Sequence, residues 1–315
     1  DRPQLAKGRS HWAFQPPRQQ PLPELSTETA TAWATSPVDR FIGAKLAAAG
    51  IEPSTAASRE LLLRRAFIDL IGLPPSPTDV QSFVADAAPD AYEQRIDALL
   101  ASPAYGERWG RHWLDVARYA DSNGLDENVA HGNAWRYRDY VIRSFNENKR
   151  FDTFTIEQLA GDLLPNPTQE QKIGSCFNRL LLTTEEGGAQ PKDYEARMLA
   201  DRVRAVGTVW LGQTLGCCQC HDHKFDPLSQ RDYYRFFAFF NNLNERTVGY
   251  NQARVSEPTI KAPTRQQQVE LDRLELAAKK LELRRDERTA SVAELQAKWE
   301  AQFAKTLVGD AAGKL

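Results

Sequence analysis

The residues best suited to chemistry lie together in one short stretch. Three cysteines and two histidines lie between residues 217 and 223 of a chain that has four cysteines and five histidines. Cys217, Cys220 and His221 form the pattern Cys-x-x-Cys-His, the local signature of covalent haem c attachment. Two thiols three positions apart can each add to one vinyl group of the same haem, and the adjacent imidazole can bind the iron. The spacing therefore predicts haem c held by these three residues, with His221 as the proximal ligand.

Other chemistry fits parts of the same cluster. Thiolate and imidazole also bind zinc, but a structural zinc site normally draws on two separated ligand pairs, and the sequence has no second such pair. A Cys-x-x-Cys redox pair would be expected beside a βαβ pattern, which we do not find. A disulfide and a chance match to a short motif remain alternatives. Haem is the interpretation that the spacing favours.

The second axial position of a haem iron has few candidate donors in this sequence. The first choice is His112, which is expected to be buried because it lies in an aromatic helix, and the alternative is Met198, the only methionine. His131 and an open or water-filled position follow, and His11 remains as another histidine. His223, two residues beyond the proximal ligand, is not expected to reach the opposite face. The choice matters because a Met/His pair raises the potential, whereas an open position permits ligand chemistry.

Composition limits the class of protein. The chain has 315 residues, enough for one large domain or two. Its net charge of −2 gives no reason to expect nucleic acid or an anionic membrane as a partner. The sequence has no run of about 18 apolar residues, so no transmembrane segment is predicted. The chain begins with Asp1, which suggests processing or an excised fragment. Because haem c is attached outside the cytoplasm, we expect an exported protein, periplasmic or extracellular, whose export signal has been lost.

The elements that must position these residues are predicted to be helices, so the fold class is mainly α, an irregular multi-helix haem c domain followed by a long helical arm. Residues 1–36 are rich in Pro, Gln, Ser and Thr and predict an extended arm. Residues 37–260 form the predicted haem domain. Caps and 3.6-residue periodicity predict helices near 37–49, 58–71, 78–84, 90–101, 103–120, 135–145, 151–164, 168–182, 193–212 and 230–240.

Residues 264–307 contain neither Gly nor Pro and predict one long helix or coiled-coil arm, followed by a tail at 308–315. Arg285 and Arg288 interrupt an otherwise apolar heptad stripe. A helix of this length reaches roughly 60 Å at 1.5 Å per residue. Because a long helix with a narrow stripe is rarely stable alone, we expect it to meet a partner helix, another domain or a second copy. The stripe consists of Leu271, Leu274, Ala278, Leu281, Val292, Leu295 and Trp299.

Three further stretches carry weaker predictions. Residues 121–128 are dense in oxygen ligands but lack the spacing of an EF-hand, so a solvated turn is favoured over a calcium site. The aromatic run at 233–240 predicts part of a haem-pocket wall, although it would also serve as plain core. Cys176 lies in an apolar run and predicts a buried core thiol.

Seven landmarks spread along the chain resemble one known family. They are residues 11–17 (HWAFQPP), 69–75 (DLIGLPP), 105–109 (YGERW), 111–115 (RHWLD), 134–139 (AWRYRD), 158–162 (QLAGD) and 217–227. Together they resemble the planctomycete-type cytochrome C domain family, found in large exported proteins, over about residues 11–243. The resemblance implies haem c at Cys217, Cys220 and His221. It also implies a neighbouring cytochrome-c-like domain before this one and an uncharacterised domain after it.

Three functions follow as expectations. The first is an electron-transfer module that passes electrons to a redox partner protein or an adjacent cytochrome domain. The second is a haem-dependent redox enzyme acting on an extracellular substrate such as carbohydrate, in a cleft lined by the acidic loops 121–127 and 185–186 with Arg136, Tyr137 and Arg138. The third is a structural assembly subunit in which haem staples the fold and the long helix drives multimerisation.

Overall fold

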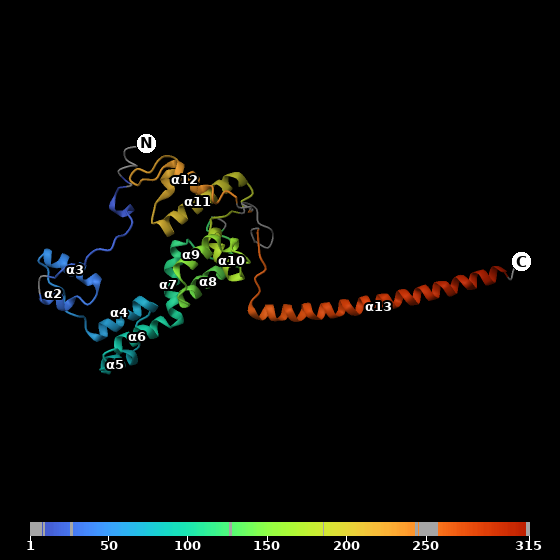
Figure 1. Ribbon diagram of the computed structural model, residues 1–315, viewed down its shortest axis with the longest axis horizontal. Helices are drawn as coiled ribbons and strands as arrows, with labels where there is room; N and C mark the ends of the chain where they lie inside the picture. Colours follow the sequence, from blue (N-terminus) through green and yellow to red (C-terminus); the bar gives the residue numbers. More distant parts are fainter. Residues whose placement is uncertain are drawn as a thin grey trace. The chain divides into compact units, whose positions relative to one another are not determined.

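The computed structural model describes residues 8, 10–25, 28–125, 128–184, 186–242, 245 and 258–312 (Figure 1). The chain divides into two compact units, Asp1–Pro258 and Thr259–Leu315. The described residues form helices joined by loops and contain no strand, only an isolated bridge between Ser122 and Ala130. The mainly α prediction is therefore confirmed. The helices are α2 (Glu28–Trp33), α3 (Pro37–Ala48), α4 (Arg59–Ile71), α5 (Pro77–Ala85), α6 (Ala91–Leu100), α7 (Pro103–Val116), α8 (Trp135–Asn146), α9 (Phe151–Ala160), α10 (Gln169–Gly174), α11 (Pro191–Leu211), α12 (Gln230–Phe237) and α13 (Arg265–Ala312).

Local chemistry starts and stops several of these helices where the sequence predicts. Ser36 and Ser229 each cap the start of a helix. The serine side chain accepts from the backbone N–H of an aspartate three residues later, and that aspartate accepts from the backbone N–H of the serine, so two otherwise unpaired N–H groups are satisfied. α4 begins after the capping side chain of Ser58. It ends at Gly72, whose φ of 74° is readily adopted by glycine. These ends follow from nearest neighbours in the chain.

Three expected segments differ from the prediction. α2 forms inside the stretch 1–36 that was expected to be extended, and Trp33 on this helix packs near Gly43 of α3. α7 ends at Val116 instead of continuing to 120, and the chain turns at Arg118, whose φ is 63°. The helices expected at 151–164 and 168–182 are each shorter. They continue as the 3₁₀ turns η2 (Gly161–Leu163) and η3 (Ser175–Arg179).

The main core of the first unit lies among α7, α8, α9, α11 and α12. Trp113 of α7 meets the ring of Phe154 at 4.8 Å and that of Trp210 at 5.5 Å between centroids, both edge to face. Leu215 and Cys218, from the cysteine-rich turn, are buried in the same cluster. The candidate site is therefore anchored directly in the core.

A hydrogen-bonded network also runs through this core. Gln158 is fully buried, and its side-chain oxygen accepts from the Tyr137 hydroxyl and, at 2.9 Å, from the Trp113 indole. Beside it, Glu157 accepts from Tyr140 at 2.8 Å and from Lys149 at 2.6 Å. The polar groups of Trp113, Tyr137, Tyr140 and Gln158 in this network therefore find partners, as most buried polar groups do.

The second unit contains α13, which confirms the long helix predicted at 264–307 and extends it to Ala312. Every side chain described on it, from residue 265 to 306, is exposed, including the apolar heptad stripe. Trp299 and Phe303 stack on each other along the helix, with ring centroids 5.2 Å apart. Within the described ranges, no helix is both long and apolar enough to cross a membrane.

Candidate functional site

The cysteine-rich stretch forms a short 3₁₀ turn directly after the longest helix of the first unit. α11 ends at Gly212, whose φ is 60°, and η4 (Leu215–Gln219) follows after two residues. Leu215 packs closely onto Gly207, where an added Cβ atom would lie 2.6 Å from the leucine side chain. Because Leu215 and Cys218 are both buried, the turn is fixed at two points and presents its other residues outward.

The turn sorts its three cysteines by exposure. Cys217 and Cys220 are exposed, whereas Cys218 is 1% exposed. Burial raises the pKa of the Cys218 thiol, which favours the neutral, unreactive form. The backbone N–H groups of Cys220 and His221 both lie 3.3 Å from the carbonyl of Cys217 and close the turn. The two thiols of the Cys-x-x-Cys-His pattern are therefore accessible together, and the intervening thiol belongs to the core.

His221 is exposed and its ring is oriented by the next residue. Its Nδ1 atom lies 2.7 Å from the carbonyl oxygen of Asp222. Because a carbonyl oxygen can only accept, Nδ1 must donate, and the lone pair of the neutral ring is then on Nε2. Metal-binding histidines are commonly held in this way, with the second ring nitrogen donating to a carbonyl or carboxylate.

α12 holds the turn from the other side through three hydrogen bonds. The backbone N–H of Gln230 donates to the Asp222 carboxylate at 2.9 Å. The Gln230 side chain and the Tyr234 hydroxyl both donate to the carbonyl of Gln219, at 3.1 and 3.0 Å. The residues on either side of Cys220 and His221 are thus fixed to a helix, which preorganises the pair.

His223 has a structural position. Its side chain is 7% exposed, and Nδ1 accepts from the backbone N–H of Asp226 at 2.8 Å. Nε2 lies 3.4 Å from the Thr214 hydroxyl. Both ring nitrogens are therefore used within the loop, which agrees with the expectation that His223 is not an iron ligand.

The donor set of the turn can be compared with what zinc and haem c each require. Among the residues that the structure describes, no three side chains of His, Cys, Asp or Glu converge as a metal ion alone would require. Haem c needs only two accessible thiols and one imidazole with a free ring nitrogen. Cys217, Cys220 and His221 supply that set.

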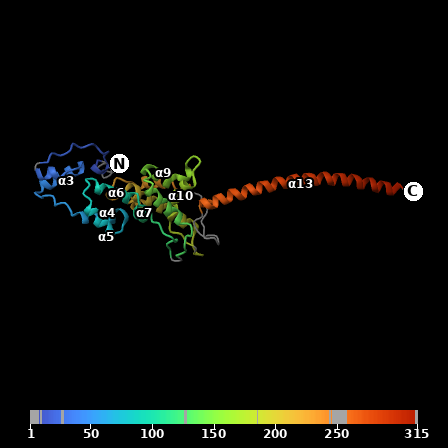
Figure 2. The same cartoon turned by 90° about the horizontal axis from the view of Figure 1, so that it is seen from below.

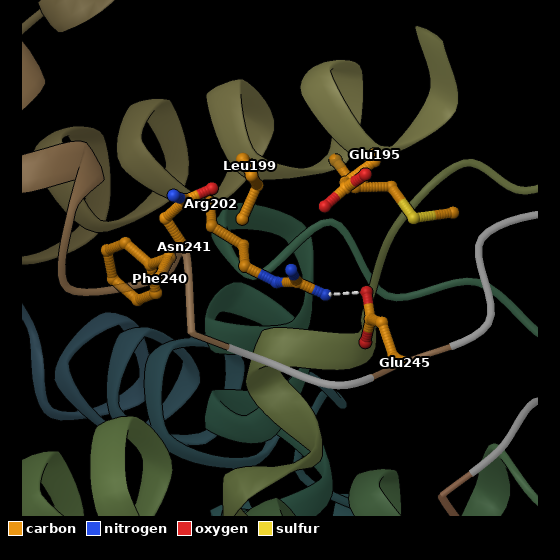
Figure 3. Close-up of a pocket in the computed structure, with 7 residues that line it drawn as sticks. Glu195, Leu199, Arg202, Phe240, Asn241 and Glu245 are labelled. Carbon is orange, nitrogen blue, oxygen red and sulfur yellow. Dashed lines mark hydrogen bonds and ion pairs between the residues drawn. The ribbon is translucent and has the colours of Figure 1, made fainter. Parts of the chain in front are cut away.

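The structure places the two predicted distal ligands differently from each other. His112 is exposed on α7 and packs against Trp109, with ring centroids 5.5 Å apart, so the expectation of a buried histidine is wrong. Met198 is 4% exposed and lines a cavity of about 20 Å³ with Arg202, Phe240 and Glu245 (Figure 3). Such a cavity has room for a water molecule and not for a porphyrin. His131 is half-buried, and its backbone N–H donates to the carbonyl of Asp121 at 2.7 Å.

A buried ion pair dominates that cavity and was missed from the sequence. Arg202 of α11 is 2% exposed and pairs with Glu245, while its Nε donates to the carbonyl of Asn178 at 2.9 Å (Figure 3). Arg179 lies 3.5 Å from the same carboxylate. Glu245 thus joins the chain beyond α12 to α11 and η3. Nothing near Glu245 in the sequence marks it as a buried charge.

The aromatic run after the turn is divided between core and surface. Tyr233 and Phe240 are buried in the main core, and Phe236 and Phe237 pack against it. Tyr234 and Phe239 are 48% and 74% exposed. Only these exposed rings remain candidates for a pocket wall. Cys176 is partly buried against the same core, in line with its prediction as a structural thiol.

The residues proposed for a substrate cleft are largely engaged elsewhere. Tyr137 is buried in the core, so its placement in a cleft is wrong. Arg136 stacks over Trp135, and Arg138 pairs with Asp139. In the possible calcium loop, Asp121 accepts from the Tyr119 hydroxyl at 2.5 Å. Asp126, Glu127 and Glu185, also part of these loops, lie outside the described residues.

Comparison with known proteins and protein families places the chain in a family. No curated protein and no solved structure matches the chain. A family model named PSCyt2, described as a protein of unknown function (DUF1549), matches residues 37–245. That range holds every helix from α3 to α12, together with the turn that carries Cys217, Cys220 and His221. The chain belongs to the PSCyt2 family.

Proposed function

We propose that this chain is a c-type cytochrome module that carries one covalently bound haem and transfers electrons to a partner. The observation that carries the proposal is the sorting of side chains in the turn after α11. The two thiols at haem-attachment spacing are exposed, the third thiol is buried, and the adjacent imidazole is oriented with Nε2 free. The family name and the resemblance of the seven sequence landmarks support the same proposal.

Each residue has a distinct part in the proposed site. Cys217 and Cys220 would hold the haem through thioether bonds, and His221 would bind the iron through Nε2. Asp222 orients His221 through its carbonyl and, through its carboxylate, holds the turn to α12. When bound, haem supplies a one-electron redox couple at this position.

Exposure of the site favours electron transfer among the three functions considered. Cys217, Cys220 and His221 all lie at the surface of the first unit, where a redox partner protein or an adjacent cytochrome domain can approach. The case for a carbohydrate-oxidising cleft is weaker because Tyr137 is buried and Arg136 and Arg138 have other contacts. Since haem c is attached outside the cytoplasm, the proposal includes export to the periplasm or cell surface.

The second unit would supply the contact with other helices. The apolar residues of the heptad stripe on α13 are 44–64% exposed, for example at Leu271 and Leu281. A stripe of this kind is normally covered by a partner helix in a coiled coil. We therefore include assembly through α13, either with a second copy or with an adjacent domain, in the proposed function.

Cysteine substitution tests the assignment with an internal control. The protein should be produced in a host that attaches haem c, denatured, and assayed for haem that stays with the polypeptide. Cys217→Ala combined with Cys220→Ala is expected to abolish covalent haem. Cys218→Ala, which replaces the buried cysteine next to Cys217, is expected to keep it. Equal haem retention in both variants would contradict the assignment of the thiols.

A further inference from the structure

The N-terminal segment lies against the loop that follows the cysteine-rich turn. A Cβ atom built on Gly8 would lie 2.9 Å from the Cβ atom of Pro227. Pro227 belongs to the loop 223–228, which is closed by a hydrogen bond from the N–H of His223 to the carbonyl of Leu228 at 2.9 Å. In Figures 1 and 2 the described N-terminal residues, in dark blue, run close to the orange part of the first unit that includes α12. Residues far apart in sequence, 8 and 227, are therefore neighbours in the first unit.

A compact turn connects Gly8 to His11. The N–H of His11 donates to the carbonyl of Gly8 at 2.9 Å, and the N–H of Phe14 donates to the carbonyl of His11 at 3.0 Å. The 3₁₀ turn η1 (Trp12–Phe14) follows. The two successive bonds keep His11 within one turn of the residue that touches Pro227. His11 is thus three residues from the contact with Pro227, which lies in the loop that follows His221.

The side chains of this turn are apolar, aromatic and uncovered. Trp12 is 80% exposed and Phe14 is 40% exposed, and both rings lie within 6.3 Å of the His11 ring between centroids. A cluster of exposed aromatic rings is normally found where another apolar surface binds. A porphyrin is a flat apolar group of the kind that such rings contact.

The ring of His11 has one nitrogen without a partner. Nδ1 accepts a long hydrogen bond, 3.3 Å, from the backbone N–H of Ala13. Nε2 has no partner among the described residues. To bind a metal through Nε2, the neutral ring would carry its proton on Nδ1, so the weak bond from Ala13 would be given up. The arrangement permits this exchange because the side chain is exposed.

The other candidate donors are less suited. His223 has both ring nitrogens engaged, one by the backbone of Asp226 and the other near the hydroxyl of Thr214. Met198 is enclosed in the cavity beside Arg202 and Glu245. His112 packs against Trp109 on α7, and His131 is half-buried with an interaction of its own. Only His11 combines an uncommitted ring nitrogen with a contact between its own turn and the loop after His221.

We propose that His11 is the second axial ligand of the haem iron, brought to the site by the contact between Gly8 and Pro227 and flanked by Trp12 and Phe14. The proposal rests on the proposed function, since it requires covalent haem at Cys217 and Cys220. It replaces His112 and Met198 as the distal ligand. It also gives the landmark HWAFQPP a role at the site.

The test is the spin state of the haem in the full chain. The wild-type protein is expected to show the absorption spectrum of a six-coordinate, low-spin haem. His11→Ala is expected to shift to a high-spin, five-coordinate or water-bound spectrum, and added imidazole should restore the low-spin form. His112→Ala, which replaces another exposed histidine, is the matched control and should keep the wild-type spectrum. Circular dichroism should show wild-type helix content in both variants, because neither side chain is buried.

The outcomes separate this inference from the proposed function. Covalent haem content, measured after denaturation, should be the same in wild type and His11→Ala. A low-spin spectrum that survives His11→Ala, or a wild-type haem that is already high-spin, would overturn the role of His11 and leave covalent attachment intact. Absence of covalent haem from the wild type would overturn the proposed function and this inference with it.

Discussion

The ion pair between Arg202 and Glu245 offers the sharpest test of the first unit. The two side chains are 2% and 9% exposed, and Glu245 also lies near Arg179. Glu245→Gln keeps the shape of the side chain and removes its charge. Arg202 would then be a buried cation whose remaining described hydrogen bond, at Nε, is to a neutral carbonyl.

The magnitude follows from burial. Removing one partner of a buried pair typically costs about 3–5 kcal/mol, because the other charge remains desolvated without compensation. The contribution of Arg179 is smaller, at about 1 kcal/mol or less, because that side chain is 30% exposed. For a domain of this size, each kcal/mol lowers the midpoint of thermal unfolding by about 2–4 °C. We therefore expect a decrease of roughly 6–20 °C in Glu245→Gln.

Near-ultraviolet circular dichroism is the appropriate assay, because most of its signal comes from packed aromatic rings of the core such as Trp113, whereas α13 contributes only Trp299 and Phe303. Glu195→Gln is the matched control, since Glu195 lines the same cavity but pairs with Lys192 at the surface, where both side chains are largely exposed. It should change stability by about 0.5 kcal/mol or less. Arg202→Met with Glu245→Leu should recover much of the loss. A free energy of unfolding of Glu245→Gln within about 1 kcal/mol of the wild-type value would refute the reasoning.

Three further predictions concern other parts of the chain. Gln158→Leu should lower the free energy of unfolding by about 1–3 kcal/mol in urea denaturation, because the Tyr137 hydroxyl loses its buried acceptor. The pKa of Glu157 is raised by burial but lowered on balance by hydrogen bonds from Lys149 and Tyr140. The ionised Glu157 should therefore stabilise the fold above its ordinary pKa of 4.5, and this contribution should be lost in more acidic solution. The free energy of unfolding of Glu157→Gln should then approach the wild-type value at low pH, as measured by unfolding at a series of pH values. Leu281→Glu should leave unfolding of the first unit unchanged and shift sedimentation toward the monomer, whereas a monomeric wild type would contradict self-association through α13.

Features set by neighbouring residues could be predicted from the sequence. The capping serines at 36 and 229 fix helix starts with groups only three residues away. The long α13 follows from an unbroken run without Gly or Pro. The spacing of Cys217, Cys220 and His221 identifies the candidate site for the same reason, since the pattern is local. No distant part of the chain is needed for these predictions.

Features set by packing could not be predicted in this way. Directly after α9, the backbone of Gln171 passes so close to Gly161 that an added Cβ would lie 2.1 Å from its carbonyl oxygen, so only glycine fits there. His112 was expected inside because of its aromatic neighbours, but Trp113 occupies the core face and His112 lies about 100° further round the helix. The contact between Gly8 and Pro227 joins two ends of the unit that no local pattern relates.

The central claim is that Cys217 and Cys220 hold haem covalently and that His221 binds its iron. The most direct measurement is the absorption spectrum of the purified wild-type protein in alkaline pyridine. The protein is produced in a host that attaches haem c, and acid-acetone extraction first removes any haem that is not covalently bound. The account predicts a c-type haemochrome, one per chain, that stays with the polypeptide. Protein from a host competent in haem attachment that carries no covalent haem would contradict the account, and the exposed thiols of Cys217 and Cys220 would then need another chemistry.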